Sequence, residues 1–366
     1  MAKTALLTLV LTVLVDRGAG NTHWSYTGEN GPQNWGKLPI PGNQCGSDRK
    51  QSPVEILTDY AMFSNNLKDL EYYKYHEPLN NPYIVNNGHT AMVVEEESPR
   101  FIESGGLPGK YIFAQLHFHW GSNASRGSEH FLDGRQYPME MHLVHYKEDY
   151  GSVVESLRYP DGLAVIGVYF EIGRKHNNQY RSLVSELQNI RTMSDRGVPI
   201  QREIVLNNLL PRRSKDFFRY NGSLTTPPCS EAVIFSLFRE AVPLSDEQIG
   251  QFRRLRVGND TSPMLVNNFR PLRPLRGRVV LRNFRSSSRP RTELEPNLSL
   301  RRTDFYPGRP WIDGNNFARC DCYAFPYQWA LCAEQCLPIW NQLQAVDYYN
   351  APADELYPVQ MLWFKK

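Results

Sequence analysis

The sequence has little net charge, and after residue 15 it has no long hydrophobic run. Its 41 basic and 38 acidic residues give a formal net charge of +3, so no nucleic-acid partner is expected for the whole molecule. No segment reaches the roughly 20 apolar residues of a membrane-spanning helix, and no transmembrane segment is predicted. Repeats and low-complexity blocks are also missing. With 41% hydrophobic residues, the composition indicates a globular protein of one large or two moderate domains.

The first twenty residues predict a secretory signal peptide. Lys3 supplies positive charge, Ala5 to Val15 form an apolar run too short to span a bilayer, and the Gly-Ala-Gly of residues 18–20 offers a cleavage site. A buried N-terminal helix is the alternative, although such a helix would normally show polar positions at helical spacing. We therefore expect a soluble, secreted mature protein.

Cysteine is scarce, and its number agrees with export. There are six cysteines, an even number that allows complete pairing in an oxidising compartment. Sequons for N-linked glycans also occur, although each is weak evidence alone because such tripeptides arise by chance. They begin at Asn123, Asn221, Asn259 and Asn297.

Residues 21–285 are dense in short alternating runs separated by Gly, Pro and Asn, which is typical of β-strands. The clearest runs are Tyr111 to Trp120, Met139 to Tyr146, Leu163 to Phe170 and Val233 to Phe238. Only residues 179–190 and 245–255 look helical; in the second, Ser245 and Gln248 have the spacing of a capping box. The sequence thus predicts an α+β fold that is mainly β.

The composition changes near residue 285. Residues 270–302 contain ten arginines, no lysine and two acidic residues, and the serines after residue 285 are typical of a linker. We assign residues 286–302 to an Arg-rich linker and 303–366 to a Cys-rich C-terminal extension. The extension's cysteines can form two disulfides in three connectivities, or bind a metal. They are Cys320, Cys322, Cys332 and Cys336.

Two histidines alternate in the run Ala114 to Trp120. Because alternate side chains of a strand share a face, Gln115, His117 and His119 point one way. The apolar residues between them point the other way and can pack on a core. Histidines at this spacing lie close enough to bind one metal ion.

A second run supplies a third histidine. Between Met139 and Tyr146, Glu140, His142 and Val144 share one face, and an adjacent antiparallel strand could bring His142 beside the first pair. Three histidines with an open fourth position form a catalytic zinc pattern. Gln115 and Glu140 each precede a histidine by two positions, where an acceptor for a ring N–H would be useful.

Other interpretations stay open at this point. A structural zinc site would favour four ligands, usually cysteines, and histidines packed in a core would need no metal. His145 faces away from His142 by parity and is assigned to the core, and His130 is assigned a structural role. Five of the nine histidines nevertheless fall within residues 115–146.

These segments resemble the α-class carbonic anhydrases, from Trp24 to about Phe284. The motifs that carry the resemblance are WSYTGENGPQNW, QSPVEI, NNGH, QLHFHWGS, GSEH, MEMHLVHY, DGLAVIGVYF, GSLTTPPCSE and NNFRP. Their number and order make the resemblance specific. It implies a single domain around a large, twisted, mostly antiparallel sheet, with Zn²⁺ at the base of a cleft.

The resemblance implies reversible hydration of carbon dioxide to bicarbonate and a proton, by attack of a zinc hydroxide. His117, His119 and His142 would be the zinc ligands. Zinc lowers the pKa of its water to about 7, a value for which carbonic anhydrase is itself the standard example. Thr225 would accept the hydroxide's hydrogen bond and donate its own to Glu129.

The resemblance also assigns the walls of the cleft. Carbon dioxide is uncharged and needs an apolar pocket, whose predicted members include Thr226 at the edge. Phe235 replaces the tryptophan usual in the family. The pocket positions are Val144, Val165, Leu224 and Val233.

Proton export is assigned to His89, which matches the family's proton shuttle; histidine titrates near neutrality. Tyr26, Asn87 and Gln115 match other cleft positions. Met92 departs from the pattern, because faster members carry a polar residue there. This departure puts the rate of proton export in doubt.

Cys45 and Cys229 fall where secreted members of the family form a disulfide, which would brace the loop that carries Thr225. A rival hypothesis makes the chain a secreted matrix protein that uses the domain as a scaffold. A combined one is an active enzyme whose Arg-rich tail binds acidic matrix polymers or carbonate mineral. That design resembles the nacrein-like proteins of calcifying animals, without their Gly/Asn repeat. A solvated linker is the simpler interpretation of the arginines.

Overall fold

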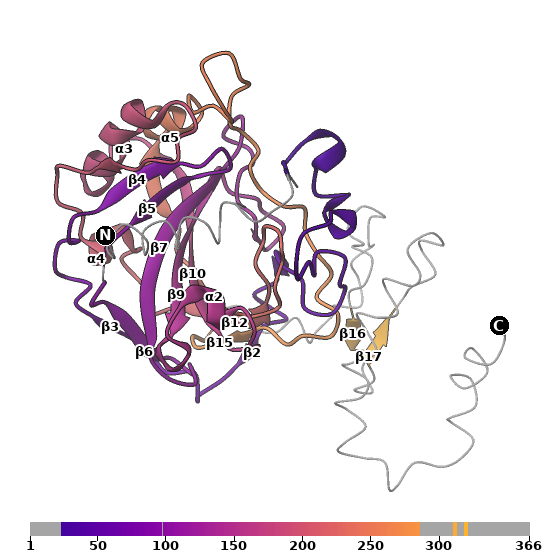
Figure 1. Cartoon of the computed structure of the whole chain (residues 1–366). Helices are drawn as coiled ribbons and strands as arrows, with labels where there is room; N and C mark the ends of the chain where they lie inside the picture. The colour runs from indigo at the N-terminus through magenta and orange to yellow at the C-terminus, as the bar shows by residue number, and fades with distance from the viewer. Residues whose placement is uncertain (1–22, 97, 286–309, 313–317, 321–366) are drawn as a thin grey trace, which may run out of the picture. The chain divides into compact units, whose positions relative to one another are not determined.

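The computed structural model describes residues 23–96, 98–285, 310–312 and 318–320. The described residues between 23 and 285 contain 15 strands, and 13 of them form one large twisted sheet (Figure 1). The strands are β1 Glu55–Ile56, β2 Met62–Phe63, β3 Leu70–Tyr73, β4 Tyr83–Asn86, β5 Ala91–Val94, β6 Phe101–Ser104, β7 Tyr111–Trp120, β8 Phe131–Leu132, β9 Met139–Lys147, β10 Leu163–Gly173, β11 Val198–Pro199, β12 Phe217–Gly222, β13 Val233–Phe238, β14 Val242–Ser245 and β15 Leu281–Arg282. Of these, β1 and β8 form a separate parallel pair.

The large sheet is mostly antiparallel, as predicted. Its strands follow the order β11-β4-β5-β7-β9-β10-β13-β12-β15-β2, while β14 pairs with β10, and β6 joins β3 to β7. Parallel pairing occurs where β10 meets β13 and β14, and where β15 meets β2. The four predicted strands are β7, β9, β10 and β13, with β9 and β10 extending slightly beyond their expected ends.

Helices are short and lie around the sheet. The structure has α2 Val153–Ser156, α3 Arg181–Glu186, α4 Leu206–Leu209 and α5 Asp246–Phe252, with 3-10 turns η1 Gly28–Asn30, η2 Trp35–Lys37, η3 Glu148–Tyr150, η4 Asn178–Tyr180 and η5 Leu187–Ile190. The predicted helix 179–190 is α3 flanked by η4 and η5. The predicted helix 245–255 is α5, and both hydrogen bonds of the Ser245–Gln248 capping box are present.

The expectation of only two helical segments is wrong. Both α2 and α4 have four residues, and such a single turn is too short to show the 3.6-residue repeat on which helix prediction depends. Tertiary contacts stabilise helices of this length, since isolated short helices are marginal in water.

The two faces of β7 have different surroundings, in agreement with the alternation of its sequence. Leu116, Phe118 and Trp120 are fully buried in the larger core, where Phe118 and Trp120 contact Phe252 of α5. The opposite face turns toward a second, smaller apolar cluster that includes Val144 of β9. The histidines of β7 therefore project from the side that leaves space for a pocket.

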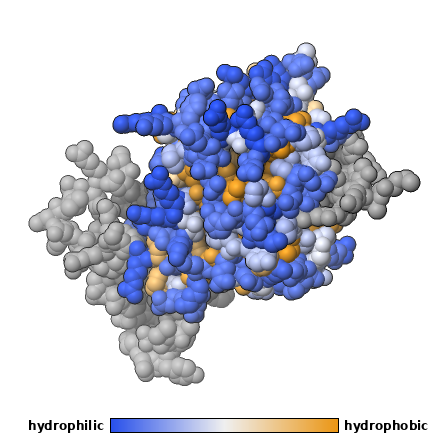
Figure 2. Space-filling view, turned by 90° about the vertical axis from the view of Figure 1, so that its left-hand side faces the viewer, coloured by the Kyte–Doolittle hydropathy of each residue, from blue (hydrophilic) through white to orange (hydrophobic). Residues whose placement is uncertain are grey.

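The chain divides into two compact units, Met1–Ser288 and Arg289–Lys366. On the face of the first unit that carries α3, α4 and β3, hydrophilic side chains dominate, and hydrophobic ones show only as scattered patches (Figure 2). No helix among the described residues is long and apolar enough to cross a membrane. In the second unit, β16 Pro310–Ile312 and β17 Ala318–Cys320 form an antiparallel pair.

Several predicted features lie outside the described residues. These are the signal peptide 1–20, the linker 286–302, the sequon at Asn297, and most of the extension 303–366, including Cys322, Cys332 and Cys336. The domain boundaries assigned from the sequence remain predictions.

Candidate metal centre

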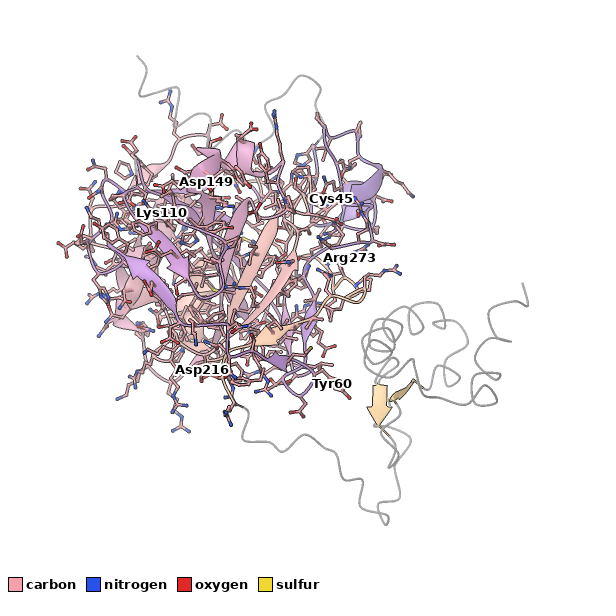
Figure 3. All side chains as sticks on the ribbon, turned by 90° about the horizontal axis from the view of Figure 1, so that it is seen from below. Cys45, Tyr60, Lys110, Asp149, Asp216 and Arg273 are labelled. Atoms are coloured by element: carbon pink, nitrogen blue, oxygen red, sulfur yellow. A yellow bond between two sulfur atoms is a disulfide. The ribbon has the colours of Figure 1, made fainter. Side chains whose placement is uncertain are left out.

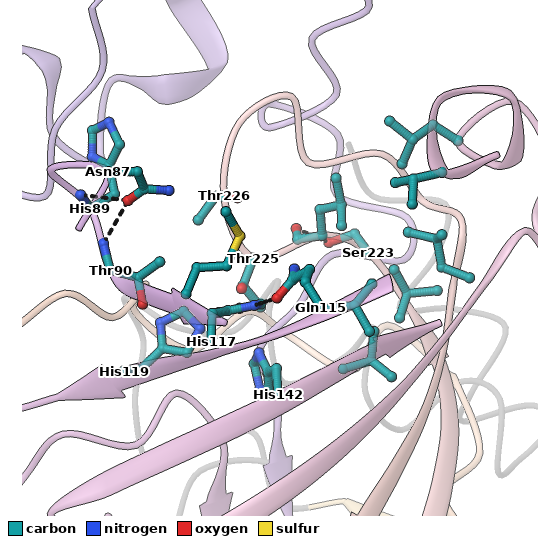
Figure 4. Close-up of a pocket in the computed structure, with 18 of the residues that line it drawn as sticks. Asn87, His89, Thr90, Gln115, His117, His119, His142, Ser223, Thr225 and Thr226 are labelled. Atoms are coloured by element: carbon teal, nitrogen blue, oxygen red, sulfur yellow. Dashed lines mark hydrogen bonds between the residues drawn. The ribbon is translucent and has the colours of Figure 1, made fainter. Parts of the chain in front are cut away.

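The three histidines predicted to bind metal meet between β7 and β9. The antiparallel register places His117 opposite His142 and His119 opposite Glu140. One ligand atom from each histidine lies within 4.8 Å of the others, and their ring centroids are 4.8–5.3 Å apart. Figure 4 shows the three rings converging at the floor of a pocket.

Each of these rings has one nitrogen held by an acceptor. Gln115 Oε1 accepts from His117 Nδ1 at 2.9 Å, and Glu140 Oε1 accepts from His142 Nε2 at 2.6 Å. The predicted acceptor role of Gln115 and Glu140 agrees with these contacts. Because the acceptors select which ring nitrogen carries the proton, the free nitrogens are Nε2 of His117 and Nδ1 of His142.

The acceptor for the third ring was not predicted from the sequence. His119 Nδ1 donates to the backbone carbonyl of Asn268 at 2.8 Å, and the Asn268 side chain accepts from the N–H of Trp120. Asn268 belongs to the motif NNFRP, but nothing in its local sequence indicates that it contacts a residue 149 positions away. A backbone acceptor leaves no side-chain pattern to find.

The histidine nitrogens fit a zinc ion. His119 Nε2 is buried and has no hydrogen-bond partner among the described residues, as expected for an atom that binds a metal. Burial lowers the pKa of His117 and His119, which favours the neutral imidazole that metals require. For His142, the Glu140 carboxylate outweighs burial and raises the pKa.

Glu129 lies beside the histidines and is fully buried. Its Oε1 accepts from the N–H of Arg270 at 2.9 Å, and its Oε2 lies 3.3 Å from His119 Nε2. Burial raises the pKa of Glu129 to about 7, although His142 and, to a smaller extent, the Thr225 side chain and the Arg270 N–H oppose that rise. Thr225 thus lies next to Glu129, as the resemblance implies.

The other two histidines of this region hydrogen-bond to neighbouring residues, although His130 also lies with Glu140 and His142 in a second group of potential metal ligands. His145 is buried in the core, bonded to the Tyr75 hydroxyl and to the Ala164 carbonyl. His130 bonds to Glu140 at 2.7 Å and to the Tyr220 hydroxyl at 2.6 Å. Both agree with the structural roles expected from the sequence.

One side of the pocket is apolar. Val144, Val165, Leu224 and Val233 all line it, as does Thr226. Phe235 completes this wall, stacked on Tyr220 with ring centroids 5.1 Å apart. Three further lining residues, from α2, its C-terminal end and the start of β10, were not predicted from the sequence. They are Val153, Leu157 and Leu163.

The predicted shuttle, His89, lines the same pocket. Its N–H donates to Asn87 Oδ1 at 3.0 Å, and its ring stacks on Trp24 with centroids 3.7 Å apart. Burial, more than the neighbouring His23, lowers the pKa of His89. Tyr26 lies close by, and Met92 is fully buried on β5, opposite His117.

A disulfide joins Cys45 to Cys229, the pair indicated by the resemblance. The Cys229 N–H donates to the Thr226 carbonyl at 2.8 Å. Cys45, labelled in Figure 3, lies at the same end of the domain as Arg273, which bonds to Asp48. The bridge thereby connects the N-terminal segment to the loop that carries Thr225 and Thr226.

Comparison with known proteins identifies the family. The sequence model of the eukaryotic-type carbonic anhydrases matches residues 30–284. The chain is 39% identical to human carbonic anhydrase 7 over 273 residues, which cover 73% of this chain and 99% of that protein. It is 35% identical to bovine carbonic anhydrase 3 over 270 residues, which cover 72% of this chain and 98% of that protein. The expectation of a carbonic anhydrase is confirmed: the chain belongs to the eukaryotic-type carbonic anhydrase family.

Proposed function

We propose that this chain is a secreted, zinc-dependent enzyme that interconverts carbon dioxide and bicarbonate. The observation that carries the proposal is the set of three converging ring nitrogens on His117, His119 and His142. Each ring is oriented by a separate acceptor, and an apolar wall begins directly beside His142. A structural zinc site would have no need for that wall.

Zinc would be held by Nε2 of His117, Nε2 of His119 and Nδ1 of His142. In carbonic anhydrases, the standard example of this effect, the ion lowers the pKa of a water molecule to about 7. Gln115, Glu140 and the Asn268 carbonyl keep the three rings in their binding orientation. Such acceptors typically contribute about 10- to 100-fold to metal affinity or activity.

Thr225 and Glu129 would orient the attacking oxygen. The Glu129 carboxylate accepts from Arg270 through Oε1, while Oε2 has no hydrogen-bond partner among the described residues. An ionised Glu129 can only accept, so its Oε2 would take the hydrogen bond of the Thr225 hydroxyl, which would keep its lone pairs for the reacting oxygen. The apolar wall receives carbon dioxide, which offers no charge for a cationic group to bind.

The proton released would leave through His89, which lies at the edge of the same pocket. Export of the protein is proposed from residues 1–20 and agrees with the Cys45–Cys229 disulfide, since disulfides persist in oxidising compartments. An extracellular matrix or mineral setting of the nacrein-like type is proposed from the arginines that follow the domain.

Stopped-flow hydration of carbon dioxide by the zinc-loaded full-length chain tests the proposal. We expect activity that a chelator abolishes and zinc restores, with one zinc per chain. His119→Ala should lower both zinc content and activity. His176→Ala, which changes an exposed histidine paired with Glu247, should leave both unchanged. Full activity without zinc would overturn the zinc dependence, and a zinc-loaded but inactive chain would overturn the enzyme and favour the scaffold hypothesis.

A further inference from the structure

Three of the four sequons lie in the described part of the chain, and they are of two structural kinds. Those at Asn123 and Asn259 lie on loops, between β7 and β8 and after α5; the second loop projects from the domain in Figure 1. In each of them the asparagine and the two residues that follow are all exposed. The third sequon begins at Asn221, inside β12.

The two loop sequons have the same local geometry. Asn123 Oδ1 accepts from the backbone N–H of Ser125 at 2.9 Å and from its hydroxyl at 2.7 Å. Asn259 Oδ1 accepts from the N–H of Thr261 at 3.1 Å and from its hydroxyl at 2.8 Å. In both, the hydroxyl that defines the sequon contacts the amide that would be modified. No described residue accepts a hydrogen bond from either Nδ2.

The sequon at Asn221 differs because its hydroxyl is used inside the fold. Ser223 is fully buried; its hydroxyl donates to the Leu224 carbonyl at 2.8 Å and accepts from the Ser52 N–H at 2.9 Å. Asn221 itself is paired with Ile234 of β13. An enzyme could reach this hydroxyl only in a chain whose β12 had not yet paired.

We propose that Asn123 and Asn259 carry N-linked glycans and that Asn221 stays unmodified. The inference rests on the proposed export, because the donor is a lipid-pyrophosphate-linked oligosaccharide of the secretory compartment. In the transfer, the asparagine Nδ2 forms a bond to C1 of the first sugar and loses a proton. The bond from C1 to the pyrophosphate oxygen breaks, and the lipid pyrophosphate leaves.

Folding separates the three sites. Pairing of β12 removes the Ser223 hydroxyl from access, whereas the tripeptides at Asn123 and Asn259 stay exposed before and after folding. The start of the Asn123 loop contacts residues on either side of the Asn259 loop: the Ser122 N–H donates to Asn267, and Arg253 donates to the Gly121 carbonyl.

The test is expression of the full chain in secreting animal cells, followed by peptide mapping of the medium after enzymatic glycan removal. We expect conversion of Asn123 and Asn259 to aspartate and none at Asn221. Ser125→Ala and Thr261→Ala should each remove one glycan, whereas Thr261→Ser should keep it and Asn221→Gln should change nothing.

Failure of the glycan inference and failure of the proposed export give different results in this experiment. Exported protein that is bare at Asn123 and Asn259, or modified at Asn221 as fully as at those two, overturns this inference alone. Protein kept in the cytosol overturns the proposed export together with the inference. Mapping the wild-type chain requires no variant to fold, and the hydration assay on secreted protein reports separately on the enzyme.

Discussion

At the scale of single residues, the surroundings of His89 oppose its proposed role as the proton shuttle. Stacked on Trp24 and partly covered, its ring has a lowered pKa, so in this position it accepts a proton poorly at neutral pH. A ring that turned away from Trp24 toward water would regain its ordinary pKa, because removal from water is the main cause of the shift. Proton transfer should therefore depend on motion of this side chain.

We predict that His89→Ala slows proton export and leaves the hydration step intact. In dilute buffer kcat should fall by about a hundredfold, the lower end of the contribution of a positioned proton-transfer group. Zinc content and kcat/KM should stay near their wild-type values, and added imidazole should restore kcat. His76→Ala, on an exposed side chain, is the matched control. An unchanged kcat in dilute buffer would remove the shuttle role.

A second prediction concerns Asp161, whose oxygens accept from Lys147 Nζ at 2.6 Å and from the Tyr150 hydroxyl at 2.9 Å. Burial opposes ionisation of Asp161, but these two donors outweigh it and lower its pKa. A lowered pKa means that the stabilisation is present above the unfolded value of about 4. It is lost as the pH falls through the folded pKa.

Asp161→Asn should therefore lower the free energy of unfolding at pH 7 by up to about 1 kcal/mol, the range of partly exposed ion pairs. The difference from wild type should shrink below about pH 4, the unfolded pKa of an aspartate. Urea unfolding at several pH values measures it, with Glu203→Gln at an exposed position as control. A difference that grows in acid would contradict the assignment.

At the scale of elements, the loop that carries Thr225 and Thr226 is held from several directions. The Cys45–Cys229 bridge connects it to the N-terminal segment, and Gln44 N–H donates to the Pro228 carbonyl at 2.7 Å. Ser47 and Gln51 both donate to Glu231, near the end of the loop. The residues proposed to orient the reacting oxygen thus depend on contacts with a segment far earlier in the chain.

Replacing both Cys45 and Cys229 by alanine should lower the free energy of unfolding by about 2–5 kcal/mol, the usual effect of losing a native disulfide. Activity should fall more than zinc content, because the bridge supports Thr225 and not the histidines. Guanidinium unfolding and zinc analysis measure the two effects. Ser47→Ala, which removes one hydrogen bond between the same segments, should cost about 1 kcal/mol. If Ser47→Ala lowered the free energy of unfolding and the activity as much as loss of the disulfide does, the bridge would have no specific role in supporting this loop.

At the scale of the whole molecule, the arginine-rich stretch has two parts, and arginines of its first part contact other residues of the domain. Arg270 is buried and bonds to Gln51, Ser52 and Cys45, and Arg278 bonds to the Gln51 and Pro274 carbonyls. In the first part of the stretch, these side chains therefore connect loops of the domain. Binding of acidic polymers is proposed only for the arginines after residue 285.

We predict that the full-length chain binds heparin or calcium carbonate at low salt and that residues 21–285 alone bind much less. The retention of the full chain should fall as salt screens the charges. Hydration of carbon dioxide should be equal in both, since the residues of the candidate site all precede residue 285. Equal retention of both chains would assign the binding to the domain and contradict a role for the tail.

The sequence by itself determined which side chains share a face. The alternation in β7 and β9 placed His117, His119 and His142 on one side and His145 on the other, because strand geometry depends only on the local backbone. The capping box at Ser245 was predictable for the same reason. The family resemblance then supplied the Glu129–Thr225 pair and the disulfide, neither of which spacing alone could indicate.

Only the tertiary structure decided which atoms of these residues face the metal position and what surrounds them. The Asn268 carbonyl orients His119 from 149 positions away, α2 brings Val153 and Leu157 to the pocket, and Trp24 covers His89. It also buried the Ser223 hydroxyl of one sequon and left the other two sequons exposed. Each of these contacts joins distant segments, and such contacts depend on how the whole sheet packs, which no local pattern of residues records.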